Sequence, residues 1–115
     1  MPKSKLEPIK VFNQEIKMSK EKIARLALND SVVTGRFKEN VLLFVEHHLE
    51  EVEPEYWQKH FGSTQPTVME VIEKLVLHEN SEDNSLDFTL PDDTTQYVLC
   101  VTFEEDKVVD ISMES

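Results

Sequence analysis

The sequence predicts an α+β fold in which three or four N-terminal helices pack on one face of a C-terminal antiparallel meander of three strands. Between residues 19 and 77 the apolar residues recur at steps of three and four, which is the spacing of amphipathic helices. After residue 85 the step changes to two, which is the spacing of strands with one buried face. With 115 residues, the chain is expected to form a single domain.

The N-terminal part of this domain, residues 9–78, is expected to be mainly helical. Residues 1–7 are polar and are expected to fray. Ile9 and Val11 alternate with polar residues, so an added N-terminal strand is kept as an alternative to a loop.

Four helices are indicated in this part. The first follows the N-cap residue Ser19 and stops at Asn29–Asp30. The second, over residues 36–52, has the most regular apolar stripe. Pro54 suits the first position of a third helix, and a fourth is expected to end near Leu77.

The C-terminal part, residues 86–114, is expected to form the antiparallel sheet. A polar stretch, NSEDNS, separates it from the last helix. Apolar and polar residues then alternate in three runs, which are joined by short polar connections. The strands are expected at residues 86–90, 97–103 and 109–113.

Negative charge is concentrated in this C-terminal part. Residues 79–115 contain eleven acidic residues and one lysine, whereas residues 1–78 contain twelve acidic and eleven basic residues. A sheet that carries this charge attracts basic proteins and repels nucleic acid. The sequence also lacks the clustered Lys and Arg that phosphate binding requires. The expected partner is therefore a basic protein, with no nucleic acid.

The candidate binding residues are acidic side chains at turn positions or at the end of the second helix, together with two aromatic residues. Tyr and Trp often anchor protein interfaces, although such rings also fill the corner between helices. No catalytic residue and no metal ligand is predicted. The candidate binding residues are Glu50, Glu51, Glu53, Tyr56, Trp57, Asp92, Asp93, Glu104, Glu105 and Asp106.

Two alternatives to a binding protein remain open. His47 or His48 with Glu51 could serve a small metal-dependent or acid–base enzyme, because a histidine and a carboxylate on one helix face can share a metal. His48 also falls on the apolar stripe, which favours a buried imidazole, and no H-E-x-x-H motif is present. In the other alternative, the last strand, residues 109–113, pairs with a second copy to form a homodimer.

The cellular location expected from the sequence is the cytoplasm, and neither membrane contact nor a cofactor is expected. No apolar run approaches the roughly 20 residues of a membrane-spanning helix, and the chain does not start like a signal peptide. The single cysteine, Cys100, cannot form an internal disulfide.

Two stretches carry a family resemblance: FVEHHL at Phe44–Leu49 and YVLCVTFEEDKVVDISMES at Tyr97–Ser115. They resemble a family of small, mostly bacterial cytosolic proteins that contain a domain of unknown function. The resemblance covers the C-terminal two-thirds of the chain and implies an α/β architecture, but no activity, cofactor or catalytic residue. Immunity proteins that neutralise toxins are similar in size and charge. The polar residues fall at turn and outer-face positions rather than in a concave site, so the sequence favours a non-catalytic protein-binding or inhibitory module, for example against a basic toxin.

Overall fold

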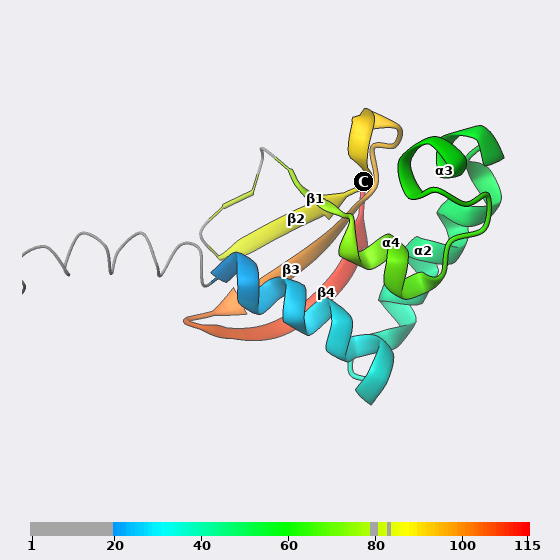
Figure 1. The fold of residues 1–115 in the computed structure, drawn as a ribbon. Coiled ribbons are helices and arrows are strands. Elements are labelled where there is room, and N and C mark those ends of the chain that lie inside the picture. Colours follow the sequence, from blue (N-terminus) through cyan, green and yellow to red (C-terminus); the bar gives the residue numbers. More distant parts are fainter. Residues whose placement is uncertain (1–19, 79–80, 83) are drawn as a thin grey trace, which may run out of the picture.

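Four helices and a four-stranded antiparallel sheet make up the described part of the chain, which in this computed structural model comprises residues 20–78, 81–82 and 84–115 (Figure 1). The predicted α+β class with N-terminal helices is confirmed. The first seven residues, the N-cap residue Ser19 and the alternative strand at Ile9–Val11 lie outside the described residues. The helices are the 20–34 helix, α2 (Lys38–Glu51), α3 (Pro54–Phe61) and α4 (Val68–Glu73). The strands are β1 (Val76–Leu77), β2 (Ser85–Thr89), β3 (Val98–Glu104) and β4 (Lys107–Glu114), and a short 3₁₀ helix, η1 (Pro91–Asp93), follows β2.

The first helix continues to residue 34, beyond the predicted stop at Asn29–Asp30. The hydroxyl of Ser31 donates to the carbonyl of Leu28 at 2.7 Å, so this residue is accommodated inside the helix. Gly35 then ends the helix with a φ of 93°, a conformation that glycine adopts without a steric penalty. The helix is therefore ended by Gly35 rather than by the predicted Asn29–Asp30 pair.

The limits of α3 follow the sequence signals closely. Pro54 occupies the first turn, where its missing N–H leaves no hydrogen bond unmade. Gly62 caps the other end with a φ of 78°, and its N–H donates to the carbonyl of Gln58. The predicted third helix is thus confirmed.

The sheet has four strands, so the prediction of a three-stranded meander was wrong by one strand. Helix α4 begins at a capping box formed by Thr67 and Glu70 and already ends at Glu73. The residues that follow, Val76–Leu77, pair with Thr89 and Phe88 of β2 rather than continuing the helix. A short apolar run of this kind fits a helix end and an edge strand equally well, and the exposed edge of β2 decides between them.

One face of the sheet lies against the helices. The strands are arranged in the order β1-β2-β3-β4, and α2 contacts β3 and β4. Leu86, Val101 and Ile111 lie side by side in register on three strands and are all buried in the core. On the opposite face the aligned residues are Asp87, Cys100 and Ser112, as expected for a sheet with one covered face.

An irregularity interrupts the pairing of β3 and β4 next to Phe103. The register shifts there, so that Phe103 is paired with Val108 and Thr102 with Asp110. Val109 is the additional residue of this bulge and is 42% exposed. The simple alternation of the sequence placed Val109 on the covered face, and the bulge corrects that prediction.

Candidate functional site

Side chains from α2 and α3 hold the turn that contains Asp92 and Asp93. The Tyr56 hydroxyl on α3 donates to the carbonyl of Pro91 at 2.6 Å. From α2, the Nε2 atom of His48 lies 3.0 Å from the hydroxyl oxygen of Thr95. The turn is thereby fixed on both sides to the C-terminal end of α2 and to α3.

His48 makes this connection as a buried, neutral imidazole. Its Nδ1 atom lies 2.6 Å from the carbonyl oxygen of Phe44, which can only accept, so Nδ1 carries the proton and Nε2 accepts from Thr95. Thr95 in turn accepts from the backbone N–H of Tyr97 at 3.2 Å. Burial lowers the pKa of His48, because the charged imidazolium would lose its hydration.

The alternative of a metal or acid–base site at His47, His48 and Glu51 receives no support from this geometry. Both ring nitrogens of His48 are already hydrogen-bonded, so neither is available to a metal or a substrate. His47 packs its ring edge-on against His48 and Tyr97, and Glu51 is exposed. Among the described residues, no three His, Cys, Asp or Glu side chains are grouped as a metal site would require.

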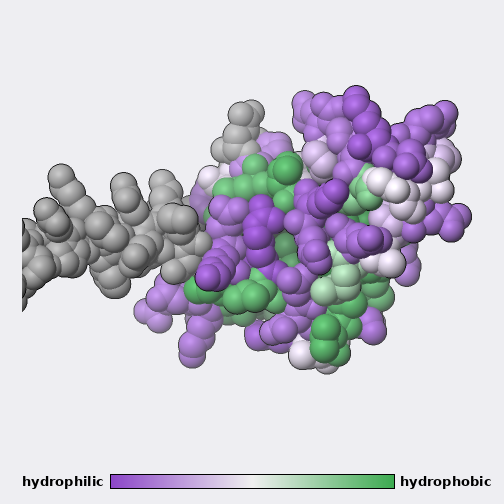
Figure 2. Space-filling view, in the orientation of Figure 1, coloured by the Kyte–Doolittle hydropathy of each residue, from purple (hydrophilic) through white to green (hydrophobic). Residues whose placement is uncertain are grey.

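The acidic corner is our name for Glu50, Glu51, Glu53, Asp92 and Asp93, which lie at the end of α2, before α3 and in the adjoining turn. All five are exposed. His60, one helical turn beyond Tyr56, lies 3.5 Å from the Asp92 carboxylate; the other four form no ion pair with any described residue. Figure 2 shows hydrophilic side chains over η1 and α3 at this end of the molecule.

Tyr56 and Trp57 have different roles. Tyr56 is half-buried beside the corner, and burial together with the negative charge of Asp92 raises the pKa of its hydroxyl to about 12. Trp57 is only 1% exposed, and its indole N–H donates to the carbonyl of Val52 at 3.2 Å. Trp57 therefore fills the core between helices, and its assignment as a surface binding residue is corrected.

The remaining candidate binding residues, Glu104, Glu105 and Asp106, lie in a second acidic group at the β3–β4 turn. Strand β3 separates this turn from the acidic corner, and its seven residues span about 20 Å at a rise of about 3.3 Å per residue. The structure thus does not gather the predicted acidic residues into one site. Glu105 has a φ of 60°, a position that favours glycine.

Side chains from outside the sheet occupy part of the free edge of β4. The guanidinium of Arg36 donates to the carbonyl of Val108 at 3.1 Å, and the amide of Asn40 donates to the carbonyl of Ile111 at 2.8 Å. An added strand would compete for these acceptors. The geometry therefore gives little support to a homodimer that pairs through this strand.

Cys100 lies half-buried on the face opposite the helices. Burial and the neighbouring Asp87 raise the pKa of its thiol to about 11, so the reactive thiolate is scarce at neutral pH. This side chain offers no nucleophile to the site.

Sequence reasoning singled out Tyr56 and His48 but missed two of the residues that they and Asp92 contact. Thr95 and His60 were not singled out, although His60 follows Tyr56 by four residues and so shares its helix face. For Thr95 the sequence contains no comparable signal, because its partner is 47 residues away.

Comparison with protein-family models, with curated proteins and with solved structures found no match. The resemblance to a family of unknown function therefore stays a prediction. No helix in the described part of the chain has both the length and the apolar composition needed to cross a membrane.

Stability should depend on pH through His48. Because burial lowers its pKa in the folded protein, the unfolded chain takes up this proton first as the pH falls below 6.5. The contribution of His48 to the free energy of unfolding is therefore complete above pH 6.5 and is lost as the pH falls below it. Urea denaturation at several pH values between 7 and 5 should show a shallower loss for His48→Gln than for the wild type. His47→Gln is the matched control, and an equally shallow loss in that variant would contradict the assignment.

Proposed function

We propose that the protein is a non-catalytic binding module of the cytoplasm that uses the acidic corner to bind a basic protein and that inhibits this partner if it is a toxin. The observation that carries the proposal is that exposed carboxylates are displayed on a frame fixed by two hydrogen bonds, from Tyr56 to Pro91 and between Thr95 and His48. A surface fixed in this way loses little conformational entropy on binding.

Two of these carboxylates lie where they reduce the stability of a helix. Glu50 and Glu51 lie in the last turn of α2, where the helix macrodipole disfavours negative charge. Glu53, in contrast, is the N-cap residue of α3, and Asp92 and Asp93 have φ values of 70° and 55°, which Asp adopts more readily than most residues. Charges placed where they reduce stability, as Glu50 and Glu51 are, are more consistent with a binding role than with solubility alone.

A binding role is also better supported than the two alternatives. Catalysis by His48 would require its hydrogen bonds to Phe44 and Thr95 to break. Self-association through β4 would compete with Arg36 and Asn40 for the edge carbonyls. Nucleic acid is disfavoured by the excess of negative charge.

Capture from a lysate of the native cell at two ionic strengths tests this proposal. The tagged protein should retain a basic protein at low salt and lose most of it at about 0.3 M salt, because screening shortens the range of exposed charges to less than 10 Å. Retention that does not change with salt, or retention of acidic proteins only, would contradict the proposal.

A further inference from the structure

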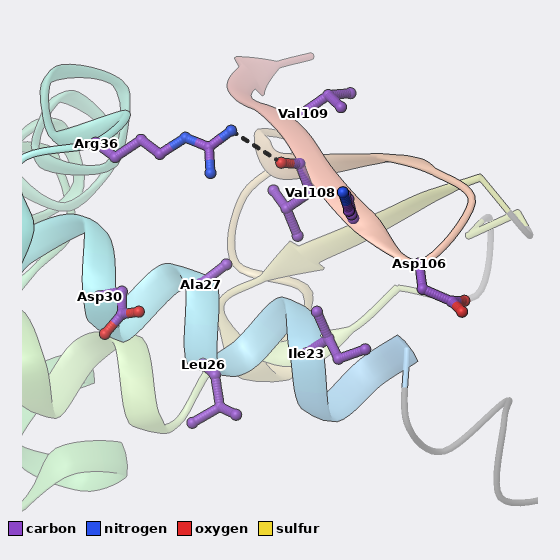
Figure 3. A pocket seen from close by; sticks show the side chains of 9 residues that line it. Ile23, Leu26, Ala27, Asp30, Arg36, Asp106, Val108 and Val109 are labelled. Carbon is purple, nitrogen blue, oxygen red and sulfur yellow. Dashed lines mark hydrogen bonds between the residues drawn. The ribbon is translucent and has the colours of Figure 1, made fainter.

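A groove of about 400 Å³ lies between the 20–34 helix and the first half of β4, and none of its lining residues belongs to the acidic corner (Figure 3). Ile23 and Ala27 point from the helix toward the strand, where Val108 faces them. Leu26 and Val109 are also among the lining residues, and in Figure 3 their side chains point outward from the helix and from the strand. The inner surface is therefore apolar and comes from two elements that are packed together.

Leu26 and Val109 expose apolar surface that the fold does not use. Leu26 is 57% exposed and Val109 is 42% exposed. The bulge in β4 is what places Val109 outside the core. Bulges often re-aim a side chain next to a binding site, and covering the apolar surface of these two residues would favour a complex.

Charged residues stand at each end of the groove, and they are not equivalent. At one end Arg36 is engaged, because its guanidinium donates to the Val108 carbonyl and lies 4.7 Å from the centre of the Phe37 ring. At the other end Asp106 adjoins Glu104 and Glu105, which are exposed and form no ion pair with any described residue. Lys107 lies in the same turn, and Lys20 from the start of the helix lies 5.8 Å from the centre of the Phe103 ring, so three carboxylates face two lysines at this end of the groove.

We propose that this groove binds a polypeptide segment of another protein, which inserts aliphatic or aromatic side chains between the helix and β4 and places Lys or Arg beside the β3–β4 turn. Docking is led by side chains, since Arg36 already takes the carbonyl of Val108 that an added strand would use. The proposal goes beyond the acidic corner, because it concerns a second surface that binds by apolar contact as well as charge.

Fluorescence anisotropy with two labelled hexapeptides tests the proposal, one of alternating leucine and lysine and one of alternating leucine and glutamate. The full chain should bind the lysine peptide and not the glutamate peptide. The double variant Leu26→Ser, Val109→Ser should weaken binding of the lysine peptide by about tenfold, as expected for the loss of two apolar contacts.

A matched double variant, Leu43→Ser with Val76→Ser, serves as the control. Leu43 is 56% exposed on α2 and Val76 is 41% exposed on the other edge strand, so the same chemistry is removed from outside the groove. This variant should bind the lysine peptide within about twofold of the wild type. Equal weakening in the two double variants, or no binding by the wild type, would overturn the proposal. Thermal unfolding should show that both variants fold.

Charge variants separate this proposal from that of the acidic corner. Neutralising Glu104, Glu105 and Asp106 should weaken binding of the lysine peptide. Neutralising Glu50, Glu51 and Glu53 should leave this binding unchanged. If only the variants of Glu50, Glu51 and Glu53 weakened binding of the lysine peptide, the groove proposal would be overturned and the proposed function would be left intact. Two further results would overturn the proposal by assigning the groove to another occupant. Dimers that disappear in the double variant Leu26→Ser, Val109→Ser would assign it to a second copy of the chain. Hydrogen-exchange protection of residues 9–18 that is lost in the same variant would assign it to that segment.

Discussion

Replacing Trp57 with alanine is expected to lower the free energy of unfolding by about 3–5 kcal/mol, the cost of truncating a large buried aromatic residue. Trp57 is 1% exposed, and its ring contacts Phe61 and Tyr56 at centroid distances of 5.1 and 5.3 Å. Because domains of this size are stable by only about 5–15 kcal/mol, the variant should be partly unfolded at moderate temperature. Urea denaturation followed by circular dichroism measures the change.

Tyr56→Phe is the control for this prediction. It removes only the hydroxyl that donates to Pro91, and the loss of one such hydrogen bond costs about 0.5–1.5 kcal/mol. A cost below 1 kcal/mol for Trp57→Ala would show that the indole is not part of the core.

Neutralising the α2 side of the acidic corner with Glu50→Gln, Glu51→Gln and Glu53→Gln is expected to slow association with the captured basic partner. Charge steering typically contributes about 10-fold to 1000-fold to the association rate at low salt, so a loss within this range is expected. The variant should fold, because Glu50 and Glu51 oppose the macrodipole of α2. Surface plasmon resonance at two salt concentrations measures the rate.

The β3–β4 turn provides a control of equal charge. Glu104→Gln, Glu105→Gln and Asp106→Asn also remove three negative charges, but at the far end of β3. If net charge alone attracted the partner, the two triple variants would slow association equally, and the acidic corner would have no special role.

Most of the helical architecture could be predicted from the sequence because its signals are local. Pro54 and Gly62 mark the two ends of α3 within eight residues of each other. The stripe of α2 places Phe44, Val45 and His48 in the core as its spacing indicates. The sequence left two interpretations of His48 open, a buried imidazole and a metal or acid–base site. The structure supports the buried imidazole.

The errors in the predicted fold arose where tertiary contacts, rather than the local sequence, determine the secondary structure. Val76–Leu77 became a strand because the edge of β2 was free to pair with it. Val109 left the covered face because a bulge inserts one residue opposite Phe103. Neither the free edge nor the bulge can be read from a local pattern of apolar residues.

The candidate site was predictable in its residue types but not in its grouping. Turn positions suggested exposed carboxylates, and those of the acidic corner are exposed. What unites the corner is the fixing of the turn by Tyr56 and His48, whose partners lie 35 and 47 residues away. The same long-range geometry places the β3–β4 turn in a separate group and buries Trp57.

Mapping the bound partner onto this protein by NMR tests the central claim most directly. Titration of the captured partner into labelled protein at low salt should shift the amide resonances of residues 50–53 and 91–95 most strongly, with smaller changes at residues 104–106. Shifts confined to the β3–β4 turn or to the face opposite the helices would show that the acidic corner is not the binding surface.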